Sequence, residues 1–194
     1  MLSKEVKRMN RAFIDRFNIS TKEWSRIQHF FYEKTVPAKT NLLYEGDIAD
    51  QLFFVNRGMV RLWHNHDGKD ITLQFFLENQ MVSSFESFTQ DIQSDFSIEC
   101  VEETSVSIIS KSNLQLLFSQ YPSFKDIMLQ QITKRFIDYT KYFLSRIEDS
   151  PQERFLRLER VNPELVDRVP DMYLASYLGI TPVSLSRIRH RIKN

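Results

Sequence analysis

Cysteine and glycine are scarce in this chain of 194 residues. The one cysteine, Cys100, excludes an internal disulfide, and it also excludes a multi-cysteine zinc site or an iron–sulfur cluster held by this chain alone. Of the four glycines, Gly46, Gly58 and Gly68 lie in turn-like segments and Gly179 lies near the C-terminus. No glycine is left for a loop that cradles a phosphate, so the common glycine-rich nucleotide motifs are excluded as well.

Neither a strong net charge nor a long apolar run is present. Lysine and arginine number 26 against 25 aspartates and glutamates, which gives a net charge of +1, so any affinity for nucleic acid must come from a local patch. No stretch is long and apolar enough to cross a membrane, and the polar residues 1–10 lack a signal-peptide pattern. We therefore expect a soluble cytoplasmic protein with no membrane partner, whose 42% of hydrophobic residues can bury a real core.

The hydrophobic period changes twice along the chain. Residues 3–34 follow a helical period, residues 35–110 alternate with a period of two, and the helical period returns after residue 112. Turn signals recur about every ten residues in the middle region, a pattern typical of a barrel or a jelly-roll-like sandwich. The expected fold class is α+β: N-terminal helices, a double-stranded, jelly-roll-like β-roll, a long dimerisation helix and a C-terminal helix-turn-helix. The expected domains are residues 1–122, 123–149 and 150–194.

Residues 123–149 predict one long helix that is apolar on more than one side. Its main stripe recurs at intervals of four or three, while other apolar residues, Leu129, Ile137 and Leu144, lie off the stripe. Because one small barrel cannot cover both faces, we expect a seam between two copies of the chain, with packing inside one chain as the alternative. The seam residues are Met128, Ile132, Phe136, Tyr139 and Phe143, on a stripe that begins at Phe124 and ends at Ile147.

The last residues, 171–194, have the pattern of a helix-turn-helix. Gly179 suits the tight turn because glycine tolerates a positive φ, and Thr181 and Pro182 suit the cap and the first position of the second helix. An ordinary helical hairpin is the alternative. Apolar residues on both sides of the turn can pack the two helices together: Leu174, Ala175, Leu178, Ile180, Leu185 and Ile188.

The second helix of this motif is cationic and carries no carboxylate side chain. A compact helix pair with a basic second helix is suited to the major groove of double-stranded DNA. Phosphate neutralisation is expected from Arg189, Arg191 and Lys193. The residues expected to contact DNA are Thr181, Pro182, Val183, Ser184, Ser186, Arg187, His190 and Arg191.

The chain resembles the Crp/Fnr family of bacterial transcription regulators over its whole length. The resemblance rests on the order of the expected elements, on two strand segments and on the helix-turn-helix. The strand segments, Tyr44–Asp47 (YEGD) and Leu52–Leu62 (LFFVNRGMVRL), look like the opening of a cyclic-nucleotide-binding roll. The resemblance implies a sensor domain of that type at residues 1–122. It also implies a homodimeric, DNA-binding transcription regulator that is not an enzyme, with RNA polymerase as a further partner.

The effector pocket departs from the pattern of the family. A glycine–glutamate pair and a later arginine–hydroxyl pair normally hold the nucleotide, but Ser83 and Ser84 stand at the first pair and Ser94 and Asp95 at the second. An aspartate has the wrong charge to bind a phosphate. Cyclic AMP is therefore not favoured as a cofactor, and both another small effector and an empty pocket remain open. The candidate pocket residues are Ser83, Ser84, Phe85, Glu86, Ser94 and Asp95, of which Glu86 reaches a ribose only if the register slips by two.

The base-reading positions depart from the family too. The resemblance places them at Pro182, Val183 and Arg187, of which only Arg187 can make a bidentate contact with guanine, while Val183 can meet a thymine methyl. The β-wing that commonly follows the motif is not expected, because the sequence ends at Asn194. The neighbouring hydroxyl residues suit phosphate contacts: Thr181, Ser184 and Ser186.

Two other function classes compete with this interpretation. Gly58, His64 and His66 match the opening of a cupin metal motif, but the glutamate, the closing glycine and the later histidine of that motif are absent, so no metal is expected. His64 is also the candidate axial ligand of a haem, although a histidine near a turn is usually only solvated. The main alternative is a dimeric scaffold or sensor that does not bind DNA.

Overall fold

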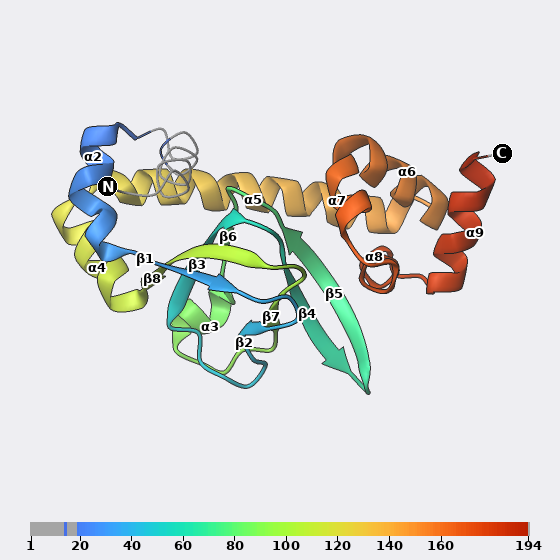
Figure 1. Cartoon of the computed structure of the whole chain (residues 1–194), viewed down its shortest axis with the longest axis horizontal. Coiled ribbons are helices and arrows are strands. Elements are labelled where there is room, and N and C mark those ends of the chain that lie inside the picture. The colour runs from blue at the N-terminus through green and yellow to red at the C-terminus, as the bar shows by residue number, and fades with distance from the viewer. Residues whose placement is uncertain (1–13, 15–18, 194) are drawn as a thin grey trace. The chain divides into compact units, whose positions relative to one another are not determined.

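The computed structural model describes residue 14 and residues 19–193 (Figure 1). Two compact units are present in it. The first contains the chain up to His64 together with Phe75–Ile127, and the second contains Asn65–Gln74 together with the chain from Met128 onward. The tip of one β-hairpin thus belongs to the same unit as the C-terminal helices.

The first unit begins with a short helix that the sequence places well. Helix α2 (Thr21–Ile27) starts at a capping box, in which Ser20 Oγ accepts from the Glu23 N–H and the Glu23 carboxylate accepts from the Ser20 N–H. A 3₁₀ turn, η1 (Gln28–Phe30), follows. The helical pattern predicted for residues 3–34 is wrong at its end, because Tyr32 already opens a strand that pairs with a distant one. The part of that prediction before residue 19 lies outside the described residues, apart from residue 14.

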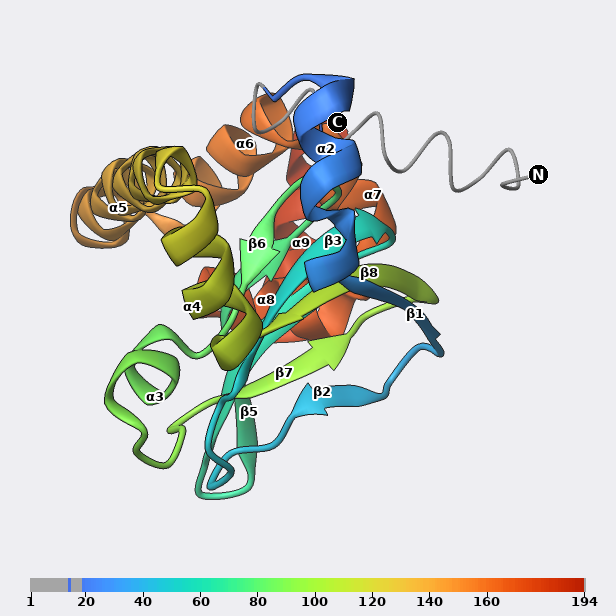
Figure 2. The ribbon, with the colours of Figure 1, turned by 90° about the vertical axis from the view of Figure 1, so that its left-hand side faces the viewer.

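Two antiparallel four-stranded sheets form the β-roll, as expected. The first has the order β1-β8-β3-β6, and these strands lie side by side in Figure 2. The second has the order β2-β7-β4-β5. Their bounds are β1 (Tyr32–Val36), β2 (Asn41–Leu43), β3 (Gln51–Arg57), β4 (Val60–His66), β5 (Lys69–Phe76), β6 (Met81–Val82), β7 (Ser97–Cys100) and β8 (Thr104–Ser110).

The roll has a dense apolar core, and β3 is buried on both of its faces, because successive side chains of a strand point to opposite sides of the sheet. On β3 the core contains Leu52, Phe53, Phe54 and Val55, each at most 5% exposed. Helix α3 (Phe85–Gln90) lies between β6 and β7 in the chain, and helix α4 (Lys111–Gln120) follows β8 with Ser110 as its N-cap.

The second unit is helical apart from its hairpin tip. Helix α5 (Ser123–Glu148) is the expected long helix, and it ends just before Ser150 caps α6 (Pro151–Val161) through a second capping box. Helices α7 (Pro163–Arg168), α8 (Asp171–Leu178) and α9 (Pro182–Lys193) complete the unit. Phe155, Leu174 and Leu185 are each at most 1% exposed and form the centre of its core.

Candidate nucleic-acid interface and effector pocket

Helices α8 and α9 meet at the tight turn that the sequence predicted. Gly179 has φ +70°, and its N–H and that of Ile180 donate to carbonyls at the end of α8. A β-carbon at Gly179 would also lie 2.8 Å from the Arg146 guanidinium. The positive φ is what favours glycine at the turn, since the Arg146 guanidinium lies at the end of a flexible side chain and could shift. The helices pack through buried apolar residues, each at most 6% exposed: Leu174, Ala175, Leu178, Leu185 and Ile188.

Helix α9 starts at Pro182 and is capped by Thr181. The Thr181 Oγ1 accepts from the Ser184 N–H at 3.2 Å and also lies 3.0 Å from the Ser184 hydroxyl. These two hydroxyls thus order the start of the helix. Of the residues predicted to contact DNA, Ser184 is half-buried, and the others are exposed: Thr181, Pro182, Val183, Ser186, Arg187, His190 and Arg191.

Arg189 does not fit the phosphate role that the sequence suggested. Its Nη2 lies 3.0 Å from the Asp171 carboxylate, and its guanidinium lies 5.8 Å from the centre of the buried Phe155 ring. The side chain is therefore used to hold α9 against α8 and α6. The exposed cations of α9 whose side chains are described are Arg187 and Arg191.

A cavity of about 350 Å³ joins these two arginines to the start of α6. Arg187 and Arg191 line it from α9, and Ser150 and Gln152 line it from the first turn of α6. The guanidinium groups of Arg187 and Arg191 are cationic, so the lining favours an anion, while the N-terminus of α6 is already capped by the Glu153 carboxylate. The sequence analysis did not single out this segment, and the Ser150 and Glu153 capping box marks a helix start without indicating which residues lie beside it.

Four of the residues predicted to hold an effector lie at the start of α3, whereas Ser94 and Asp95 lie between α3 and β7, and the hydroxyls of Ser83 and Ser94 are hydrogen-bonded within the protein. Ser83 Oγ donates to the Gln51 carbonyl at 2.9 Å, and Ser94 Oγ donates to the Phe96 carbonyl at 2.7 Å. Ser84 is 3% exposed and is the N-cap of α3, where its side chain makes no capping bond. Two hydroxyls of the predicted set thus stabilise local backbone.

The acidic members of the set, Glu86 and Asp95, are exposed to solvent, and Phe85 is half-buried. The Asp95 carbonyl lies 3.0 Å from Nδ1 of His64, which is also 3.3 Å from a Glu45 carboxylate oxygen. His64 therefore ties the end of β4 to neighbouring loops, which accounts for this histidine without a haem.

The sheet that contains β4 and β7 holds a buried ion pair that the sequence did not reveal. Arg61 Nε donates to a Glu99 carboxylate oxygen at 2.8 Å, and the two side chains are 2% and 8% exposed. The guanidinium also lies 4.8 Å from the centre of the Trp63 ring. Arg61 is therefore neutralised by its partner and supplies no open charge for a bound phosphate.

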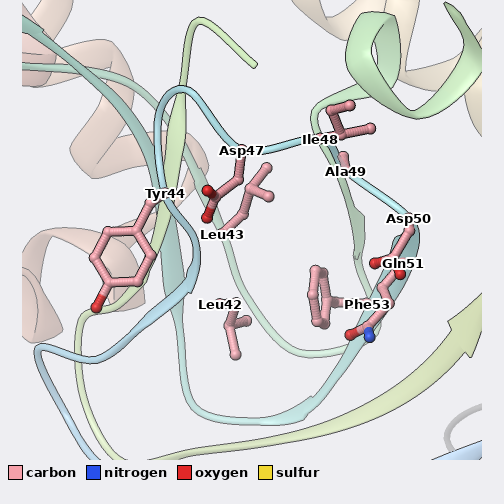
Figure 3. Close-up of a pocket in the computed structure, with 9 residues that line it drawn as sticks. All are labelled: Leu42, Leu43, Tyr44, Asp47, Ile48, Ala49, Asp50, Gln51 and Phe53. Atoms are coloured by element: carbon pink, nitrogen blue, oxygen red, sulfur yellow. The ribbon is translucent and has the colours of Figure 1, made fainter. Parts of the chain in front are cut away.

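A second cavity, of about 370 Å³, lies at the end of β2 and the loop that leads to β3 (Figure 3). Its floor is apolar, with Leu43 and Phe53, and the carboxylates of Asp47 and Asp50 stand at its rim. None of the six predicted effector residues lines it.

Helix α5 exposes a long row of apolar side chains. Leu129, Ile132, Phe136, Tyr139 and Phe143 are between 40% and 69% exposed and follow one another at alternating intervals of three and four. This is the spacing of the two inward positions of a coiled-coil heptad. Phe124, at the start of the predicted stripe, is only 7% exposed, and Met128 is half-buried.

Among the residues that the structure describes, no helix is long and apolar enough to span a membrane. The same residues contain no group of three or more histidine, cysteine, aspartate or glutamate side chains placed to hold a metal ion.

Comparison with known proteins agrees with this architecture. Residues 33–121 match the family model of the cyclic nucleotide-binding domain. The anaerobic regulatory protein of Bacillus subtilis (strain 168) is 24% identical over 98 residues, and the match covers 50% of this chain and 41% of that protein. This chain thus spans about two fifths of the length of the curated relative that it matches.

Solved structures resemble a larger part of the chain. The c-di-GMP responsive global regulator CLP of Xanthomonas campestris matches with a TM-score of 0.71 and 18% identity, over 90% of this chain and 92% of that one. A CooA mutant from Carboxydothermus hydrogenoformans matches with a TM-score of 0.72 and 16% identity, over 93% and 84%. The Bacillus protein and CLP are named as regulators, in keeping with the expectation that this chain is not an enzyme. Residues 33–121 are therefore similar to the cyclic nucleotide-binding domain, and the chain shares the fold of CLP and CooA over most of its length.

Proposed function

We propose that this protein is a transcription regulator that binds double-stranded DNA as a homodimer, with α9 in the major groove. The observation that carries the proposal is the helix-turn-helix of α8 and α9, with an ordered turn and an exposed cationic second helix. The regulators among the relatives support it.

The two exposed arginines of α9 have different roles in this proposal. Arg187 is placed to read a base, since a guanidinium can donate two hydrogen bonds to guanine. Arg191 contacts a backbone phosphate at the cavity that α9 shares with the start of α6.

The homodimer forms through the exposed apolar row of α5. Its five residues have the heptad spacing of a two-stranded seam, and their exposure in a single chain is the reason to expect a partner. Two identical chains related by a two-fold axis present the same residues to each other, which matches a continuous stripe.

Cyclic AMP is not the effector in this proposal. The Ser83 and Ser94 hydroxyls are bonded to backbone carbonyls, Asp95 brings a negative charge, and the Arg61 guanidinium is paired with Glu99. Another small effector, or none, is compatible with this arrangement.

Fluorescence anisotropy with a DNA duplex selected by the protein tests the interface. Arg187→Ala should lose about 1–3 kcal/mol, selectively at one guanine in each half-site. Arg191→Ala should weaken binding to all sequences alike and lower the slope of log K against log salt by about 0.9 for each phosphate that is no longer neutralised. If neither substitution changes affinity, α9 is not the DNA-contacting helix. If the wild type binds no duplex, the scaffold alternative replaces the proposal.

A further inference from the structure

Strand β5 lies at the edge of its sheet and turns its free side toward α8. An edge strand presents backbone N–H and C=O groups without a neighbouring strand to pair with. At the tip of the β4–β5 hairpin, the Thr72 N–H donates to Ser176 Oγ at 2.9 Å, and the same hydroxyl donates to the Asp70 carbonyl at 2.7 Å. One side chain of α8 thus bonds two successive outward groups of the strand, as the backbone of a neighbouring strand would.

Strand β5 is also hydrogen-bonded to α5, at Gln74. The Arg135 guanidinium, on α5, donates to the Gln74 side chain at 2.9 Å, four residues after Asp70 on the hairpin. The hairpin tip therefore has polar contacts with both α5 and α8, and the residues that make these contacts all belong to the second compact unit.

Helix α8 is also held by α5 and α6 at its C-terminal end. Arg146 donates to the Tyr177 carbonyl at 2.9 Å, Arg154 donates to the Leu178 carbonyl at 3.0 Å, and the Tyr142 hydroxyl lies 3.2 Å from the Tyr177 carbonyl. The Tyr142 and Tyr177 rings stack with their centres 5.0 Å apart. Because the last carbonyls of a helix lack partners within the helix, these donors fix the end of α8. One residue before Tyr177 on α8, the Ser176 hydroxyl adds the bonds to the edge of β5.

The contact between the hairpin tip and α8 leaves the recognition helix open. Thr72 is 2% exposed at the contact, whereas Val183 is 61% exposed and Arg187 is exposed on α9. The contact therefore affects how α8 and α9 are oriented, and it does not cover the residues of α9 that are proposed to contact DNA.

We propose that Ser176 and the hairpin tip, Asp70–Thr72, form a strap that fixes α8, and through it α9, in the orientation used to bind DNA. The effect on DNA rests on the function proposed above, whereas the strap itself does not. In a dimer, two recognition helices must reach half-sites about 34 Å apart, one turn of the duplex. Groups that are already ordered lose less entropy on binding, so the strap raises affinity by preorganisation.

The experiment measures the strap and its effect separately, in the full chain. Hydrogen exchange of the Thr72 amide, followed by NMR, reports the bond to Ser176 without any DNA. Ser176→Ala should speed this exchange by about tenfold, because the amide loses an acceptor at a strand edge. The same variant should bind DNA about three- to tenfold more weakly.

Two further variants serve as controls. Ser119→Ala removes a hydroxyl that bonds only a carbonyl of its own helix, Leu116 O at 2.8 Å, and should change neither quantity. Ser176→Thr keeps the hydroxyl, so its Thr72 exchange rate and its DNA affinity should both be close to those of the wild type. Circular dichroism checks that each variant is folded.

If the Thr72 amide of a folded Ser176→Ala protein exchanges at the wild-type rate, the proposed strap does not exist. Faster exchange with equal or tighter DNA binding would overturn its orienting role. A wild type that binds no DNA would overturn the proposed function and the orienting role together, while the exchange rate would still decide whether the strap exists.

Discussion

Phe136→Glu is the substitution that most directly tests the seam on α5. Phe136 is 69% exposed in the single chain and lies in the middle of the apolar row, between Ile132 and Tyr139. In a homodimer both copies are changed at once, and two carboxylates face each other across the two-fold axis. The variant should therefore be a monomer at concentrations where the wild type is a dimer.

The size of the effect follows from the exposed area. A phenylalanine buries roughly 150–250 Å² when it is fully covered, so two copies that are 69% exposed bring about 200–350 Å² to the seam. At about 25 cal/mol per Å² this area is worth roughly 5–9 kcal/mol. Buried area converts only in part to affinity. Even about 3 kcal/mol raises the dimer dissociation constant by about a hundredfold.

Sedimentation velocity at micromolar concentrations gives the oligomeric state directly. Gln130→Glu is the matched control, since it adds the same charge at an exposed position of α5 away from the apolar row, and it should leave the dimer intact. A wild type that is already monomeric, or a Phe136→Glu protein that remains a dimer, would refute the assignment of the seam to this helix.

Three further outcomes are expected. Calorimetry with cyclic AMP should give no dissociation constant below about 10 μM, which corresponds to roughly −7 kcal/mol, and a tighter constant would show that the pocket is intact. Burial raises the pKa of the Cys100 thiol from 9.0 to about 11, so the free energy of unfolding should fall as pH rises from 9 toward 11, because the unfolded chain releases the thiol proton more readily. Urea titrations at several pH values measure this fall, which should be smaller in a Cys100→Ala variant, because burial also raises the pKa of Tyr142 and Tyr177. Glu99→Ala removes the carboxylate that neutralises the buried Arg61 guanidinium and should lower the free energy of unfolding by about 3–5 kcal/mol in the same assay; a decrease below about 1 kcal/mol would mean that the charge reaches water.

Local signals were sufficient to predict the helix-turn-helix. The positive φ of Gly179, the Thr181 cap and the first position of Pro182 are each decided by neighbours within a few residues, so the sequence carries them directly. These elements are confirmed.

Contacts between distant residues could not be read in this way. The pairing of Arg61 with Glu99 depends on the register between β4 and β7, and the bonds of Ser176 join residues more than 100 positions apart. No local pattern marks such partners. The end of the first helical region was misplaced at Tyr32 because β1 gains its hydrogen bonds from β8, far along the chain.

The apolar stripe of α5 shows an intermediate case. Its existence followed from periodicity, but a stripe drawn at intervals of four drifts around the helix. Phe124 consequently belongs to the core of the first unit, whereas Leu129 joins the exposed row. Which face is open depends on the packing of the rest of the chain.

Selection from a random pool of duplex DNA tests the central claim most directly. The account predicts enrichment of a pseudo-palindrome with half-sites about 34 Å, or one turn of DNA, apart. It also predicts that Arg187→Ala loses the preference for one guanine in each half-site, while Arg191→Ala selects the same motif with lower affinity. If no two-fold related motif is enriched by the wild-type protein, the chain is not a sequence-specific dimeric regulator. If a motif emerges but Arg187→Ala leaves its base preferences unchanged, α9 does not read the sequence as proposed.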